Sequence, residues 1–476
     1  MPVTSLTFLF VFLPITIVAY YAACLIGRNR SGNRSGAKAL LLAASIIFYS
    51  LSALEFIPHL LVLTGIVYIL ARVAQNKRGT ARKAITATGI IINISFLAFY
   101  KYFDFFGELC SWLFKTPFVN FGILQPLGIS FLVFSLISYL VDVHRGTIAA
   151  DKNLINVLLW SFFFAKIAAG PIVRYAQMYR TDQETPNVPC LDEIATGVRR
   201  FVIGLGKKAI LANTLGLTVD KIFSAQIDGI STPVAWIGII CYTFQIYLDF
   251  SGYSDMALGV ARMLGFRFEE NFNYPYAART VGEFWRRWHI SLSSWLRDYL
   301  YFPLGGSRRG NVYVNLIVVF LVSGLWHGAS LHFVAWGAWW GLFMVIDRAY
   351  RVHIAPKHTL PTWLTWSFTM IVVVLGWVIF RAESSTQAVS YLLNLVGIGA
   401  DPTFPWGVRY YLDNRTITFL AASLLLSTPL FKSLERRYEN TPVWQACRMI
   451  GTPVLFLASI VFIMNADYSP FMYAQF

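Results

Sequence analysis

Two tryptophan–histidine pairs, Trp288-His289 and Trp326-His327, lie close together in a strongly apolar part of the sequence. A neutral imidazole, with an ordinary pKa of ~6.5, can take a proton from an attacking hydroxyl or thiol near neutral pH. Ionisable groups inside a bilayer are expensive, and they usually mark a pathway or a reaction centre. We therefore predict that His327 is a general base, and its flanking glycines would let a second backbone or a substrate approach it closely. The alternative is that His327 only hydrogen-bonds a neighbouring helix.

Residues 283–302, around His289, carry apolar side chains at steps of three and four residues, the period of an amphipathic helix. This stripe comprises Trp285, Trp288, Leu292, Trp295 or Leu296, and Tyr299. Arg286, Ser293 and Arg297 fall on another side, and interleaved tryptophan and arginine suit the headgroup level of a bilayer. We predict one helix that lies near the cytoplasmic interface or dips into the membrane as a re-entrant segment. A simple membrane-surface anchor is the alternative.

A third polar patch occupies residues 242–259. Its polar side chains, too many for a helix that faces lipid, are Gln245, Asp249, Ser251, Ser254 and Asp255. They could line a cavity, bind a coupling ion in a transporter, or fix a broken helix through hydrogen bonds to its backbone. Because polar groups at residues 249–256 interrupt a long apolar run, this segment is a poor simple span.

The composition is that of a membrane protein, with 57% hydrophobic and 13% charged residues, whereas a soluble chain is about 25% charged. A helix needs about 20 apolar residues to cross the hydrocarbon core, and long continuous runs favour helices over barrel strands. The sequence therefore predicts an all-α integral membrane fold with roughly 11–13 spanning or part-spanning helices in a single domain, residues 1–476. The candidate runs are 5–27, 37–53, 56–75, 83–102, 123–141, 153–170, 199–217, 232–248, 312–328, 331–347, 362–381, 416–431 and 449–465.

Basic residues cluster in short loops between the apolar runs, so the net charge of +15 reflects membrane topology rather than nucleic-acid binding. By the positive-inside rule these loops are cytoplasmic. The clusters contain Arg28, Arg30, Arg34 and Lys38; Lys77, Arg78, Arg82 and Lys83; Arg308 and Arg309; Arg348, Arg351 and Lys357; and Lys432, Arg436 and Arg437. One run precedes the first cluster and one follows the last, which predicts that both termini are extracytoplasmic. No basic stretch precedes the first run, so a retained helix is expected rather than a cleaved signal.

Several reaction types lack their usual motifs. The sequence contains no GxSxG elbow, no HExxH and no P-loop, which argues against serine-hydrolase, metalloprotease and nucleotide-hydrolysis chemistry. Its five scattered cysteines include no CxxC pair, so neither a metal site nor a disulfide framework is predicted.

Five sequence blocks, in order, resemble the membrane-bound O-acyltransferase superfamily, and specifically its bacterial branch of alginate O-acetyltransferase membrane subunits. The blocks are PLGISFLVFSLISYLVDVHRG (126–146), FFFAKIAAGPIVRY (162–175), YTFQIYLDFSGYSDMALG (242–259), FWRRWHISLSSWLRDYLYFPLGG (284–306) and GLWHGASLHFVAWGAWWG (324–341). The resemblance covers residues 126–347. It implies a multi-spanning fold with re-entrant segments and a central funnel or tunnel.

The resemblance also implies roles for individual residues. His327 matches the catalytic histidine, and His289 matches a second characteristic polar position, an asparagine in many eukaryotic relatives. Such enzymes take an acyl thioester from the cytoplasm, here acetyl-CoA as the expected co-substrate, with no bound cofactor and no metal. Donor binding is expected at Trp285, Arg286, Arg287 and Arg297, with Arg308 and Arg309 also able to meet phosphates. The expected tunnel lining is Gln245, Asp249, Ser251, Asp255 and Trp326.

The expected function is the export of acetyl groups across a bacterial inner membrane for O-acetylation of alginate, cellulose or peptidoglycan. The C-terminal FMYAQF resembles an FxYxxF pattern, which makes Tyr473 a possible acyl relay or merely an interfacial anchor. A separate extracytoplasmic hydrolase-like chain would complete the transfer. The alternatives are D-alanylation of teichoic acid, a transporter or flippase, and a catalytically silent scaffold.

Overall fold

The computed structural model describes residues 1–30, 35–168, 170–184, 190–224, 230–356, 358, 360–401 and 406–465. All regular elements in these residues are helices, which confirms the predicted all-α fold. Within these residues, seven helices are long and apolar enough to cross a membrane, or up to eight if one pair bent by 61° is a single span. They are Phe8–Ile26, Ser35–Gln75, Gly79–Phe114, Leu191–Phe223, Thr232–Met263, Thr362–Arg381 and Pro442–Met464, with the bent pair Asn414–Leu426 and Leu430–Tyr438.

This number is lower than that of the apolar runs because two runs merge, one breaks, and run 312–328 forms a shorter helix, Val312–His327. Runs 37–53 and 56–75 lie in one helical stretch, Ser35–Gln75, of 41 residues. Run 153–170 instead breaks at Phe163, leaving two short helices, Leu154–Phe162 and Phe164–Ile167. Apolar length alone does not distinguish a full span from a helix that ends inside the protein.

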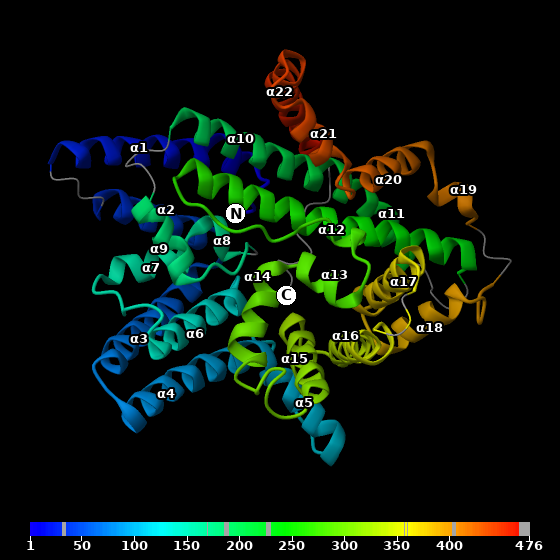
Figure 1. Cartoon of the computed structure of the whole chain (residues 1–476), viewed down its shortest axis with the longest axis horizontal. Helices are drawn as coiled ribbons and strands as arrows, with labels where there is room; N and C mark the ends of the chain where they lie inside the picture. Colours follow the sequence, from blue (N-terminus) through cyan, green and yellow to red (C-terminus); the bar gives the residue numbers. More distant parts are fainter. Residues whose placement is uncertain are drawn as a thin grey trace. The chain divides into compact units, whose positions relative to one another are not determined.

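The chain packs as two compact units, residues 1–201 with 254–269 and residues 202–253 with 270–476. In the first unit lie η1 (Phe8–Phe12), α1 (Leu13–Arg30), α2 (Ser35–Ala53), η2 (Leu54–Phe56), α3 (Ile57–Gln75), α4 (Gly79–Leu97), η3 (Ala98–Tyr102), α5 (Phe103–Phe114), α6 (Ile129–Arg145), α7 (Leu154–Phe162), α8 (Phe164–Ile167) and α9 (Tyr175–Glu184) (Figure 1). The helices α10 (Leu191–Gly206) and α12 (Thr232–Met263) have residues in both units. The single domain expected for residues 1–476 stays a prediction.

The second unit contains the histidine segments. Its helices are η4 (Lys207–Ala212), α11 (Asn213–Phe223), η5 (Pro275–Ala277), α13 (Val281–Arg287), α14 (Ile290–Leu296), η6 (Arg297–Tyr301), α15 (Val312–His327), α16 (Leu331–Ala349), η7 (Tyr350–Ile354), α17 (Thr362–Arg381), α18 (Ser385–Leu395), α19 (Val408–Tyr411), α20 (Asn414–Leu426), α21 (Leu430–Tyr438) and α22 (Pro442–Met464).

Helix α12 runs unbroken through the polar patch, so the broken-helix alternative is wrong. The two carboxylates of the patch form ion pairs without a break in the helix. Within the second unit, Asp249 pairs with Lys208 of η4 at 2.5 Å, and both side chains are buried. Within the first unit, Asp255 forms an ion pair with Arg200 at 2.8 Å. A paired carboxylate can stay in a continuous buried helix because its charge is compensated.

Helices α15 and α16 form a closely packed antiparallel pair. A Cβ atom at Gly324 would collide with the carbonyl oxygen of Phe333, and one at Gly337 would lie 2.5 Å from that of Phe320. Further along, a Cβ at Gly341 would lie 3.2 Å from the Cα of Ile317. Small residues let helix backbones approach this closely in a membrane. The contact fixes the end of α15, where His327 lies.

The segment of residues 281–306 enters and leaves at one end of the α15–α16 pair, and we call it the re-entrant segment. Near its start, the Gly282 N–H donates to Asp347 at the end of α16 at 3.2 Å. After it, Asn315 near the start of α15 donates to the Gly306 carbonyl at 3.0 Å. In between, the ring of His289 lies 6.0 Å from that of Trp326. The segment therefore extends along α15 from Asn315 to Trp326, which is about 17 Å at 1.5 Å per residue.

The single helix predicted for residues 283–302 is wrong. The chain breaks at Trp288 and His289, which separate α13 from α14. The surface-anchor alternative is also wrong, since Trp285, Trp288, Leu292 and Trp295 are buried in the protein. The periodic stripe reflects packing against neighbouring helices rather than a lipid interface.

Replacing Lys208 with Met should remove the cation that pairs with the buried Asp249 carboxylate. We expect this to lower the free energy of unfolding by about 3–5 kcal/mol. The double variant Lys208→Met/Asp249→Leu removes both charges and should recover much of the loss. Thermal unfolding of the detergent-purified variants measures this, and equal melting temperatures for the single and double variants would contradict a compensated pair.

Candidate active site

The backbone break at His289 is held by a neighbouring loop. Trp288 is extended, and His289 has a φ of 43°, in the left-handed region that few side chains adopt. The Ile290 N–H donates to the Asn271 carbonyl at 2.9 Å, and the Asn273 N–H donates to the Arg287 carbonyl at 2.9 Å. These bonds satisfy backbone groups that the break releases from helical hydrogen bonding.

Asn271 also orients the His289 ring. Its side-chain oxygen accepts from the Ser291 N–H at 3.1 Å and from the Ser291 hydroxyl at 2.9 Å. The same oxygen lies 3.2 Å from His289 Nδ1. Because this oxygen only accepts, a hydrogen bond requires the proton on Nδ1, so the Nδ1–H tautomer of neutral His289 is favoured.

One indole ring lies beside both histidines. The Trp326 ring centroid is 6.0 Å from His289 and 4.7 Å from His327. The His327 ring is further enclosed by the rings of Trp336 at 4.9 Å and Phe380 at 5.2 Å. Both imidazoles are buried, with exposed fractions of 1% and 2%. The two tryptophan–histidine pairs therefore belong to one cluster.

Aromatic packing holds the re-entrant segment against the helices that surround that cluster. The Trp285 ring lies 5.1 Å from Phe320 on α15 and 5.0 Å from Trp340 on α16. The Trp288 ring lies 4.8 Å from Trp377 on α17. Large rings contribute extensive contact area and preferred edge or tilted geometries, which makes the segment rigid. Trp285 is thus placed as a buried packing residue.

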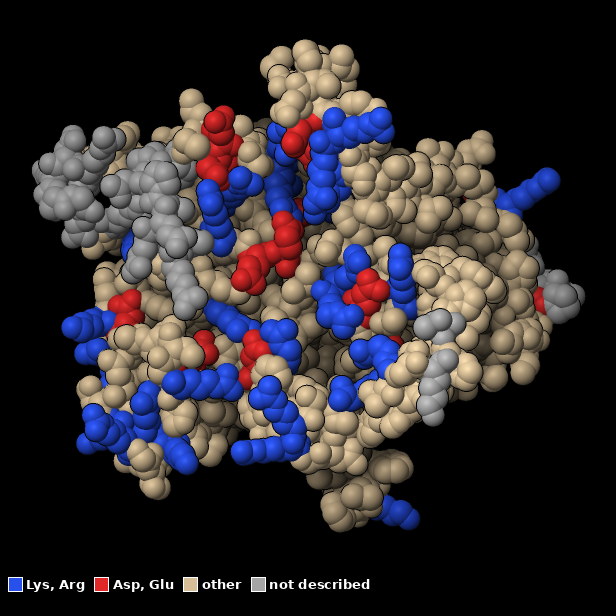
Figure 2. Space-filling model, in the orientation of Figure 1, with Lys and Arg blue, Asp and Glu red and all other residues tan. Residues whose placement is uncertain are grey.

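The arginines expected to bind the donor differ in their availability. Arg286 is exposed and makes no hydrogen bond or ion pair with the described residues. Arg287 is engaged by Glu283 at 2.8 Å and by the Asn273 carbonyl, and Arg297 is engaged by Asp298 at 2.8 Å. Figure 2 shows basic side chains with acidic ones among them in the region of α13.

Two pKa shifts follow from these contacts. Burial raises the pKa of Glu283, but hydrogen bonds from the Arg279 N–H and from Arg287 outweigh burial, so its pKa lies below the ordinary value. The hydrogen bond to Asp298 raises the pKa of Arg297. Both pairs are therefore charged near neutral pH, which leaves Arg286 as the guanidinium of α13 best able to meet an incoming phosphate.

Four of the expected tunnel residues, Gln245, Asp249, Ser251 and Asp255, lie on the continuous helix α12, and Trp326 lies on α15. Gln245, Asp249 and Ser251 are buried in the second unit, whereas Asp255 belongs to the first unit and binds Arg200. The pair with Lys208 favours a structural role for Asp249. The side-chain amide oxygen of Gln245, Oε1, and the Ser251 hydroxyl have no hydrogen-bond partner among the described residues. These two atoms are the polar groups of the patch that remain available to a bound molecule or water.

Sequence reasoning missed Asn271, Trp336, Phe380 and Lys208. Asn271 stands in the motif NFNYPY between two apolar helices, and an asparagine near a helix break is a usable signal. The other three had no signal before their partners were known. Tyr473 lies outside the described residues.

Comparison with known proteins identifies the family. Residues 93–386 match the model of the MBOAT, membrane-bound O-acyltransferase family. The chain is 37% identical to a probable alginate O-acetylase AlgI of Pseudomonas putida, over 99% of both chains. It is 34% identical to a peptidoglycan O-acetyltransferase of Helicobacter pylori, over 82% of this chain and 79% of that protein. It is also 30% identical to a teichoic acid D-alanyltransferase of Streptococcus thermophilus, over 48% of this chain and 58% of that one.

The match to the family model covers both tryptophan–histidine pairs and the helices that hold them. The protein is a multi-pass membrane O-acyltransferase, and the chain belongs to the membrane-bound O-acyltransferase family.

Proposed function

We propose that this enzyme takes an acetyl group from acetyl-CoA on the cytoplasmic side of a bacterial inner membrane and transfers it for O-acetylation of an extracytoplasmic polysaccharide. The observation that carries the proposal is the convergence of His289 and His327 on the ring of Trp326. Relatives named for alginate and peptidoglycan O-acetylation support a polysaccharide acceptor.

His327 acts as the general base in this proposal. Its imidazole takes the proton of an acceptor hydroxyl, and the resulting oxygen attacks the thioester carbonyl carbon. The new C–O bond forms, the C–S bond breaks, and the imidazolium returns its proton to the thiolate of CoA. Enclosure by Trp326, Trp336 and Phe380 supports this role, because a dry site strengthens interactions with developing charge.

His289 serves as a positioning residue for the thioester. Its ring is fixed by Asn271 and packs nearly perpendicular to the ring of Phe250, at 4.6 Å. Such fixation keeps a donor carbonyl in line with His327, which lowers the entropic cost of reaction.

The donor enters along α13 in this proposal. Arg286 binds a CoA phosphate by charge-assisted hydrogen bonds, and Arg308 and Arg309 add positive charge. This orientation places the basic loops in the cytoplasm and both termini outside.

The acetyl group leaves the enzyme on the extracytoplasmic side. The acceptor hydroxyl that His327 deprotonates is the phenol of Tyr473, which takes the acetyl group from CoA as a phenyl ester, since a phenol of pKa ~10 loses its proton more readily than an aliphatic hydroxyl. A separate hydrolase-like chain then passes it to the polymer. A D-alanyl group is less well supported as cargo, because the D-alanyltransferase match covers 48% of the chain.

Replacing His327 with Ala should lower the rate of CoA release from labelled acetyl-CoA by about 10²–10⁴-fold, the usual contribution of a general base. His332→Gln is the matched control, because His332 is also buried but hydrogen-bonds Ser330 at 2.8 Å. A folded His327→Ala enzyme that turns over like the wild type would refute the role of His327.

Replacing His289 with Asn should preserve the melting temperature, because Asn accepts the left-handed backbone and can still bond Asn271. His289→Val, which is branched at Cβ, should cost about 1–3 kcal/mol of stability. The Asn variant should raise KM for acetyl-CoA more than it lowers kcat. An unchanged KM in a stable His289→Asn enzyme would mean that His289 does not position the donor.

Replacing Arg286 with Gln should raise KM for acetyl-CoA several-fold, and the difference from wild type should shrink as salt is added, because phosphate contacts are screened. Lys432→Gln removes one exposed charge from α21 without touching α13 and serves as the control. Steady-state kinetics at low and high ionic strength measures both. Equal KM values for Arg286→Gln and Lys432→Gln would exclude the phosphate contact.

A further inference from the structure

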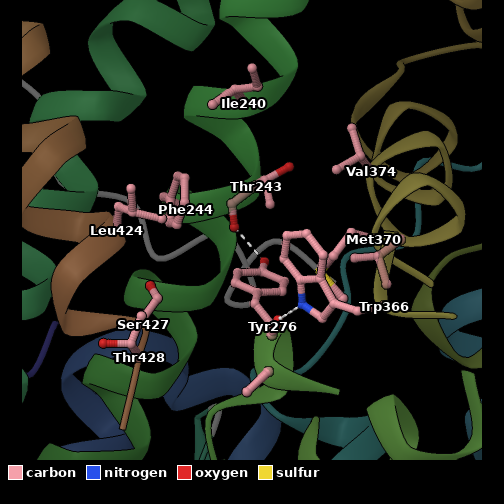
Figure 3. Close-up of a pocket in the computed structure, with 12 residues that line it drawn as sticks. Ile240, Thr243, Phe244, Tyr276, Trp366, Met370, Val374, Leu424, Ser427 and Thr428 are labelled. Carbon is pink, nitrogen blue, oxygen red and sulfur yellow. Dashed lines mark hydrogen bonds between the residues drawn. The ribbon is translucent and has the colours of Figure 1, made fainter. Parts of the chain in front are cut away.

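A cavity lies in the second unit, and neither of the two histidines lines it. Its volume is about 360 Å³, and α12, η5, α17 and the end of α20 line it. Figure 3 shows Tyr276 and Trp366 within it, with Met370 and Val374 on one side and Leu424 on the other. The volume falls in the lower range of small-molecule sites.

The polar atoms on this lining are bonded within the protein. The Tyr276 hydroxyl donates to the Thr243 carbonyl, and the Trp366 indole N–H donates to the Tyr276 carbonyl at 2.9 Å. The hydroxyls of Thr243, Ser427 and Thr428 each donate to a carbonyl of their own helix or its end. A cavity that offers apolar surface and already bonded donors suits a hydrocarbon, because water in it would lack partners.

The rim of the cavity faces outward from helices that are built to lie in lipid. Ile240, Trp366 and Leu424 on the rim have exposed fractions of 38%, 44% and 55%, whereas Val373 on the floor is fully buried. The rim residues belong to membrane-spanning α12 and α17 and to the bent pair that begins with α20. The molecules adjacent to such a rim in a bilayer are lipid chains, and filling the cavity restores dispersion contacts that a void forfeits.

We propose that this cavity binds one fatty-acyl chain of a membrane phospholipid. The chain packs against Tyr276, whose ring also contacts Phe284 at 6.5 Å and Trp288 at 6.4 Å. Trp288 directly precedes His289 at the backbone break. The bound acyl chain therefore supports the re-entrant segment through Tyr276, and it takes no part in acyl transfer.

Photo-crosslinking tests the site directly. The full-length protein is reconstituted into phosphatidylcholine vesicles that contain a phospholipid with a diazirine near the end of one acyl chain. After illumination, mass spectrometry maps the labelled residues. We expect labelling concentrated at the cavity lining of α12, α17 and α20. A probe with the diazirine on the headgroup should not label the floor.

Matched tryptophan substitutions then separate cavity binding from general lipid contact. Val374→Trp fills the cavity and should reduce its labelling several-fold, whereas Ile371→Trp, on the lipid-facing side of the same helix, should not. Even labelling along all lipid-facing helices of the wild type would overturn the proposal, even if Val374→Trp failed to fold. Displacement of the probe by long-chain acyl-CoA but not by excess phospholipid would also overturn it, since the occupant would then be a donor chain.

Discussion

The close contact between α15 and α16 is the constraint on which the candidate active site depends. Three glycines, Gly324, Gly337 and Gly341, bring the two backbones together where any Cβ would meet opposing main-chain atoms. In a bilayer no hydrophobic driving force holds helices together, so close packing has to supply much of the attraction. The rigid pair fixes His327 at its end and presents Phe320, Trp336 and Trp340 as a surface for the re-entrant segment.

The re-entrant segment has to meet two structural requirements that oppose one another. It has to reach the buried end of α15, which favours large apolar rings, and it has to break its helix there, which exposes polar backbone groups. Tryptophans at positions 285 and 288 meet the first demand through ring packing. Asn271 and Asn273 meet the second through backbone and side-chain hydrogen bonds. Non-helical backbone at membrane depth is tolerated where protein surrounds it in this way.

Much of the fold could be predicted from the sequence because apolar length and helical period directly reflect the bilayer. The same signals misled at two places. The tryptophan stripe of residues 283–302 has a helical period on both sides of His289, so periodicity did not reveal the break. The polar patch of α12 resembled an interruption because Lys208, its partner, lies on another helix. Residue roles that depend on a distant partner, such as Asn271 with His289, require the tertiary fold.

The Lys208–Asp249 pair has a consequence for a protein in an energised membrane. A single buried charge displaced across the full potential changes in energy by about 2.3 kcal/mol per 100 mV. Because the two charges lie 2.5 Å apart and are opposite in sign, the field acts on them as a short dipole rather than as a net charge. Small movements of η4 together with α12 therefore do little electrical work, and the second unit can hold ionised groups without becoming a voltage sensor.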